Sequence, residues 1–177
     1  MSKSGMNRRQ FLEASSVAVA GTAAAVGTGT MLVAPDGAWA MTLQVFDEHT
    51  ATTLVHMSRE IYPHDRLGDV YYAQVVEGLD GKAVKDKALG TLLTEGVATL
   101  DQSEGGVKWV DLSPGYKLAT LKQIETTPFF QTVRGELVTG LYNNPAVWRH
   151  FGYEGASAEY GGYIDRGFND LGWLDEE

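Results

Sequence analysis

The chain has 177 residues, a formal net charge of −9 and no cysteine. The lack of cysteine excludes disulfides, thiol nucleophiles, cysteine-held iron–sulfur clusters and haem attached through a C-x-x-C-H motif. The excess of acidic over basic residues argues against nucleic acid as a partner, because polyanions are bound through Lys and Arg contacts. The length suits a leader followed by one modest domain with a single core.

The leader begins with the features of an export signal. Arg8 and Arg9, followed closely by Phe11 and Leu12, have the form of a twin-arginine motif. This motif is the address of a pathway that carries folded proteins across the bacterial cytoplasmic membrane. Residues 17–33 are mildly apolar, and a helix over them would be at the short limit for spanning a bilayer.

A candidate cleavage site ends the leader. Ala38 and Ala40 place small side chains at the two positions that a signal peptidase must admit. We therefore expect residues 1–40 to be a signal peptide that is removed, with a retained N-terminal anchor as the alternative. The protein is expected in the periplasm, and export in the folded state is typical of proteins that carry a cofactor or travel with a partner that does.

Residues 41–150 are expected to form an all-α domain, because no convincing alternating strand pattern interrupts the helical ones. Pro63 stops the first predicted helix, and Asp80-Gly81 is expected to turn the chain after the second. Ser113-Pro114 and Thr127-Pro128 each supply an N-cap residue and a proline at the first helical position. Apolar residues recur at helical spacing over 44–62, 67–79, 84–100, 116–125 and 128–142. The prediction is a single small domain of about five helices.

Residues 151–177 are rich in glycine and aromatic residues, which is typical of neither a helix nor a flexible polar linker. Aromatic side chains bury roughly 150–250 Å² each, and a disordered tail would leave much of that area in water. We therefore expect this extended C-terminal segment to pack, either over its own helices or as a docking segment on another protein. The candidate interface residues are Tyr153, Tyr160, Tyr163, Phe168 and Trp173.

The polar residues available for chemistry form no recognised motif. His49 and His56 lie two helical turns apart, with Glu60 one turn further, but the compact ligand spacings of zinc sites are missing. His64 and Asp65 stand together at a helix break, where Asp65 is expected to cap the next helix. We therefore predict no catalytic residue, no cofactor site and no metal site in this chain.

Several segments, taken together with the twin-arginine signal, carry a family resemblance. They are 61–65 (IYPHD), 127–130 (TPFF), 141–148 (LYNNPAVW), 151–155 (FGYEG), 161–163 (GGY) and 172–174 (GWL). The chain resembles the small subunit of bacterial flavin-dependent sugar and polyol dehydrogenases. That group includes the gluconate 2-dehydrogenase subunit 3 type and the small subunits of related sorbitol, fructose, glucose and glucoside 3-dehydrogenases. The resemblance covers nearly all of residues 41–177, and the aromatic–glycine tail is its most specific part.

The resemblance implies a non-catalytic partner of a large FAD-containing subunit of the glucose–methanol–choline class. Such a small subunit escorts the large one through the twin-arginine translocase and stabilises it, and electrons then pass to a cytochrome c. Membrane association would come through partners, and the expected substrate of the complex is a sugar or glycoside. The alternative is an independent periplasmic sugar-binding protein or enzyme, whose aromatic tail would stack on sugar rings.

Overall fold

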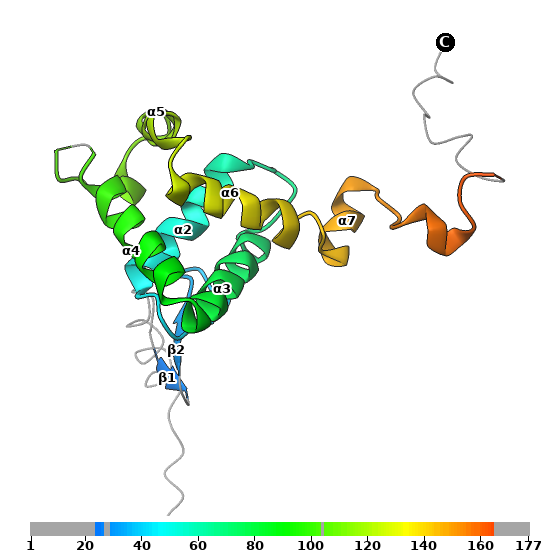
Figure 1. Ribbon diagram of the computed structural model, residues 1–177, viewed down its shortest axis with the longest axis horizontal. Coiled ribbons are helices and arrows are strands. Elements are labelled where there is room, and N and C mark those ends of the chain that lie inside the picture. The colour runs from blue at the N-terminus through cyan, green and yellow to red at the C-terminus, as the bar shows by residue number, and fades with distance from the viewer. Residues whose placement is uncertain (1–23, 27–28, 104, 165–177) are drawn as a thin grey trace, which may run out of the picture.

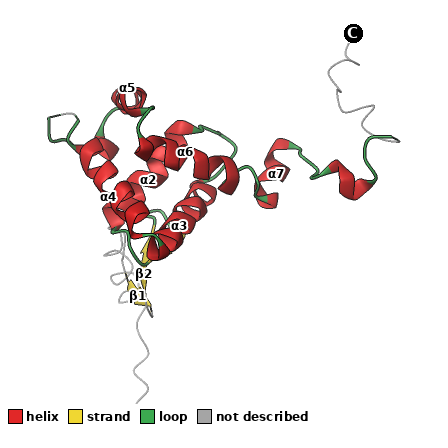
Figure 2. Cartoon of the chain, viewed as in Figure 1, coloured by secondary structure: helices red, strands yellow, loops and turns green. Residues whose placement is uncertain are grey.

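The computed structural model describes residues 24–26, 29–103 and 105–164, with side chains from residue 29 onward (Figure 1). Helices dominate this part of the chain, which confirms the predicted all-α class (Figure 2). The α-helices are α2 (Glu48–Ile61), α3 (Asp69–Lys85), α4 (Lys87–Asp101), α5 (Pro114–Ile124), α6 (Pro128–Gly140) and α7 (Pro145–Phe151). Two 3-10 helices, η1 (Trp109–Asp111) and η2 (Ser157–Tyr160), complete the helical elements of the described residues.

Helices α2, α3, α4 and α6 form the body of the domain, and each of them contacts the other three. Their apolar faces meet in one core, because every helix presents residues three and four apart to the centre. Leu54 and Met57 of α2, Leu79 of α3, Leu93 of α4 and Leu137 of α6 are fully buried there. Helix α5 lies at one side of this body, near the start of α6 (Figure 1).

Three short antiparallel strands precede the helices: β1 (Ala24–Val26), β2 (Gly29–Val33) and β3 (Ala40–Leu43), in sheet order β1-β2-β3. The sequence-based expectation of no strand, and of a helix through residue 33, is therefore wrong for these residues. Buried Met41 and Leu43 alternate with exposed neighbours along β3, but a period of two over four residues is too short to be recognised in a sequence.

The predicted turn at Asp80-Gly81 is also wrong, because both residues lie inside α3. The buried Asp80 carboxylate accepts backbone hydrogen bonds from the chain that enters α2. Its donors are the N–H groups of Gln44 at 2.7 Å, Val45 at 2.9 Å and Phe46 at 2.8 Å. These tertiary hydrogen bonds outweigh the low helix propensity of the Asp-Gly pair.

The predicted helix starts are correct for α5 and α6, although the caps differ in detail. Thr127 caps α6, since its hydroxyl accepts the Phe130 N–H at 3.3 Å. Ser113 occupies the N-cap position of α5 but makes no side-chain cap bond. The predicted cap at Asp65 is wrong, because α3 begins four residues later and Gly68 occupies its N-cap position.

Candidate docking segment at the C-terminus

The chain from Trp148 to Ile164 leaves the helical body instead of folding back over it. Figure 1 shows α7 and η2 running outward from the end of α6. We call residues 148–164 the arm. Within it, only Gly155 is buried, and the side chains of Tyr153, Tyr160 and Tyr163 are 51%, 56% and 57% exposed. The described part of the tail therefore contributes no side chain to the core of the domain.

The first half of the arm is nonetheless ordered around Trp148. The indole N–H of Trp148 donates to the Tyr142 carbonyl at 2.7 Å, and its ring meets the Tyr153 ring edge to face at 5.1 Å. Gly152 and Gly155 have φ of 71° and 109°, which L side chains rarely adopt. A Cβ on Gly155 would meet the Trp148 ring at 3.5 Å, an ordinary contact distance, so the positive φ is what favours glycine there. The glycines of the FGYEG segment thus set the path of the arm around this indole.

A cluster of aromatic and histidine side chains, the root, fixes the arm to the body. The imidazole Nε2 of His64 lies 2.6 Å from the Tyr142 hydroxyl, and its ring lies 5.0 Å from that of Phe151. The Tyr71 hydroxyl lies 2.9 Å from Nε2 of His150. Burial raises the pKa of the Tyr142 phenol above its ordinary value. The root brings the IYPHD, LYNNPAVW and FGYEG segments together, although they are far apart in sequence.

The root fixes the position of His64, with Asp65 next to it. His64 is occupied by its hydrogen bond to Tyr142, whereas Asp65 is exposed beside it. A surface cleft of about 380 Å³ lies here, and its walls include His64, Asp65, Arg66, His150 and Phe151. The imidazole therefore has a structural partner that accounts for its position.

The other two histidines lie on α2 and do not converge. The ring of His49 binds the carboxylate of Asp101, which also accepts the Trp109 N–H at 2.9 Å, so the pair joins α2 to α4 and η1. Desolvation, together with the positive charge of Lys117, lowers the pKa of His56, although this side chain keeps much of its surface in solvent. In the described part of the chain, no three His, Asp or Glu side chains lie together as metal ligands would.

The structure places only some of the residues selected from the sequence. Tyr153, Tyr160 and Tyr163 are exposed on the arm, as a docking segment requires. Ala38 and Ala40 lie in the hairpin before α2, where both are exposed. The selected residues outside the described part of the chain are Arg8, Arg9, Phe11, Leu12, Phe168 and Trp173. The root was not predicted from the sequence, because no local sequence pattern indicates that His64 and Tyr142 are in contact.

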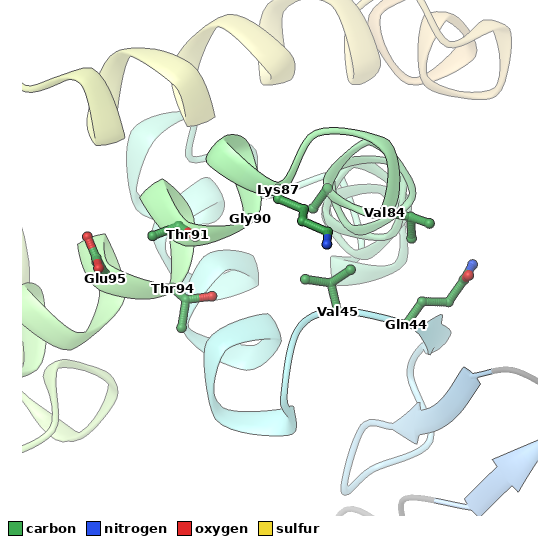
Figure 3. Close-up of a pocket in the computed structure, with 9 residues that line it drawn as sticks. Gln44, Val45, Val84, Lys87, Gly90, Thr91, Thr94 and Glu95 are labelled. Atoms are coloured by element: carbon green, nitrogen blue, oxygen red, sulfur yellow. The ribbon is translucent and has the colours of Figure 1, made fainter.

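Two clefts on the helical body bear on the sugar-binding alternative. A groove of about 690 Å³ lies between the chain entering α2 and helix α4. Figure 3 shows its lining side chains, with Val45 facing the Lys87 side chain. The described residues that line this groove include no aromatic side chain. A cleft of about 500 Å³ between α2, α5 and α6 does combine Tyr62 and Phe130 with the charged Glu60 and Arg134. Aromatic faces beside such polar groups are what sugar binding calls for.

No described helix has both the length and the apolar character needed to cross a membrane. A scan against models of protein families, a search of curated proteins and a search of solved structures each found no match.

Proposed function

We propose that this chain is the non-catalytic small subunit of an exported FAD-dependent sugar or glycoside dehydrogenase. Its role is to escort the large flavoprotein subunit, of the glucose–methanol–choline class, through the twin-arginine pathway and to stabilise it afterwards. The chain carries no FAD in this account; the cofactor belongs to the partner, and a cytochrome c accepts the electrons. The observation that carries the proposal is the arm, which is ordered and rich in aromatic residues yet does not pack on the core of its own domain.

The arm has the physical properties of an anchor for another protein. Tyr and Trp dominate the binding energy of protein interfaces, because they bury a large area with little loss of conformational freedom. The contacts of Trp148 with the Tyr153 ring and with the Tyr142 carbonyl hold the first half of the arm in place before binding, which reduces the entropy lost on binding. A run of exposed aromatic side chains on a projecting segment is typical of an interaction site. The large flavoprotein subunit is the partner that the resemblance assigns to it.

Purification from the periplasm tests this proposal. We expect the tagged chain to bring down a larger yellow protein, with the absorbance spectrum of oxidised flavin. Replacing Tyr153, Tyr160 and Tyr163 together by serine should release this protein, since each aromatic anchor at a hot spot contributes about 2 kcal/mol or more. The matched control is Tyr116→Ser on α5, which removes a tyrosine of similar exposure, 59%, from a helix of the body.

Two results would contradict the proposal. One is a tagged chain that purifies alone, as a colourless monomer, from cells that express the enzyme. The other is a flavoprotein that stays bound to the triple serine variant but is lost with Tyr116→Ser, which would move the interface to α5. Far-ultraviolet circular dichroism of the triple variant should match that of the parent chain.

The cleft beside Tyr62 and Phe130 favours the sugar-binding alternative, and a direct titration separates the two functions. An independent sugar-binding protein would be a stable monomer that gives a saturable heat of binding when titrated with millimolar glucose in a calorimeter, and Tyr62→Ala would abolish that heat. The small-subunit proposal predicts no saturable heat of binding for the chain without its partner.

A further inference from the structure

The segment expected to be discarded with the signal peptide is built into the folded domain. Strand β2 pairs with β3 in antiparallel register, with Leu32 opposite Met41 and Val33 opposite Ala40. The turn between them is closed by a hydrogen bond from the Ala34 N–H to the Trp39 carbonyl at 2.9 Å. The bond between Ala40 and Met41, at which cleavage is expected, therefore lies inside a strand of the sheet.

Side chains on both sides of that bond are part of the hydrophobic core. Leu32, Ala34 and Trp39, which precede it, are only 2%, 6% and 8% exposed. Met41 and Leu43, which follow it, are buried in the same core. Removal of residues 1–40 would thus take away β2 and leave the apolar surface beneath Leu32 and Trp39 open to water.

The second edge of β3 is occupied as well. The Glu77 carboxylate of α3 accepts the Thr42 N–H at 2.8 Å, and Asp80 accepts the Gln44 N–H at 2.7 Å. These N–H groups belong to alternate residues, so they point to the same side of the strand, away from β2. Strand β3 is therefore held between β2 on one edge and α3 on the other.

A protease that binds its substrate as an extended segment needs a free strand edge and accessible side chains, and this hairpin offers neither at the cleavage site. Recognition of an extended peptide uses backbone hydrogen bonds along a free strand edge and pockets for alternate side chains. Ala38 and Ala40 are exposed, but Trp39 between them is buried, the Ala38 N–H binds the Asp36 carboxylate at 3.0 Å, and Ala40 pairs with Val33. A peptidase reaches this bond only after the hairpin has opened.

We propose that the folded domain shields the Ala40–Met41 bond from signal peptidase, so that the exported chain retains residues 29–40 as part of its sheet. This inference depends on the proposed export role only for the presence of signal peptidase in the compartment that the chain reaches. The shielding itself is a property of the domain, and it is tested on the purified chain. In the cell, it predicts a periplasmic protein whose first residue is at or before Gly29, not Met41.

The test incubates the purified full-length chain with signal peptidase in detergent and follows the N-terminus by mass spectrometry. A peptide spanning residues 1–45, which keeps the whole export signal but not the helical domain, should be cut after Ala40, and the folded chain should be cut at least tenfold more slowly. Leu32→Asp, which charges a buried side chain of β2 without changing residues 36–41, should restore rapid cleavage. Thr30→Asp, at an exposed position of the same strand, should leave the chain resistant.

A folded chain that is cut as fast as the peptide would overturn the inference, as would a peptide that resists, since the fold would then not be the cause. Periplasmic protein beginning at Met41 would contradict it in the cell. If Leu32→Asp fails to fold, chymotrypsin provides a second measurement on the parent chain. Cleavage after Trp39 should be slow in buffer and fast in urea, and equal rates would refute the shielding.

Discussion

Replacing Asp80 by asparagine should destabilise the domain severely, although the two side chains have the same size. In the parent chain, the carboxylate accepts three backbone N–H groups at 2.7–2.9 Å. An amide keeps one acceptor oxygen and turns its NH₂ toward at least one of these donors. Hydrogen bonds to a charged group contribute about 1.5–3 kcal/mol each. One lost bond and two weakened ones therefore predict a loss of about 3–5 kcal/mol, a large share of the 5–15 kcal/mol typical of a domain.

Urea unfolding followed by circular dichroism measures this loss directly. The matched control is Glu77→Gln, one turn earlier on α3. Among the described residues, its parent carboxylate accepts one backbone N–H, that of Thr42 at 2.8 Å, from a more exposed position. The glutamine oxygen can still accept that bond, so we expect a change below about 1 kcal/mol. The reasoning fails if Asp80→Asn costs no more than this control, because the buried carboxylate would then not be what holds the entry to α2.

Two further predictions concern packing and chemistry. Gly96→Ala should lower the free energy of unfolding by about 1–3 kcal/mol, since its Cβ would overlap the Phe129 ring. Gly78→Ala, with no atom within 4 Å of its Cβ, should instead gain up to about 1 kcal/mol from helix propensity, and urea unfolding compares the two. Alanine at His64 and Asp65 should leave the turnover of the assembled complex unchanged per bound FAD. A catalytic base would be worth on the order of 10²–10⁴-fold, so a hundredfold fall with assembly intact would place this chain in the active site.

The helices were predictable where a local pattern carries the information. Helices α5 and α6 begin at Ser-Pro and Thr-Pro pairs, and the apolar residues of α6 recur at helical spacing, so neighbouring residues alone locate them. Helix α3 continues through Asp80 for a reason that no local pattern contains. The carboxylate there binds backbone groups 34 to 36 residues earlier in the chain. The hairpin escaped prediction because its period-2 segments are short and because the export motif suggested a different role for them.

The candidate docking segment was likewise predictable in part: its exposed tyrosines were, and the root was not. Its exposed tyrosines could be selected from composition, since glycine with many aromatic residues fits neither a helix nor a linker. The root could not, because the His64–Tyr142 contact joins residues 78 positions apart. Such contacts depend on how the helices pack, which spacing along the chain does not encode.

Export of the flavoprotein tests the central proposal most directly. Arginines 8 and 9 are replaced together by lysine in the chromosomal copy of this chain, and FAD released from periplasmic and cytoplasmic fractions is measured beside dye-linked sugar dehydrogenase activity. We predict that both this chain and the large flavoprotein stay in the cytoplasm, because under the proposed function the flavoprotein has no export signal of its own and depends on that of this chain. A variant that retains this chain in the cytoplasm while the flavoprotein still reaches the periplasm would contradict the account.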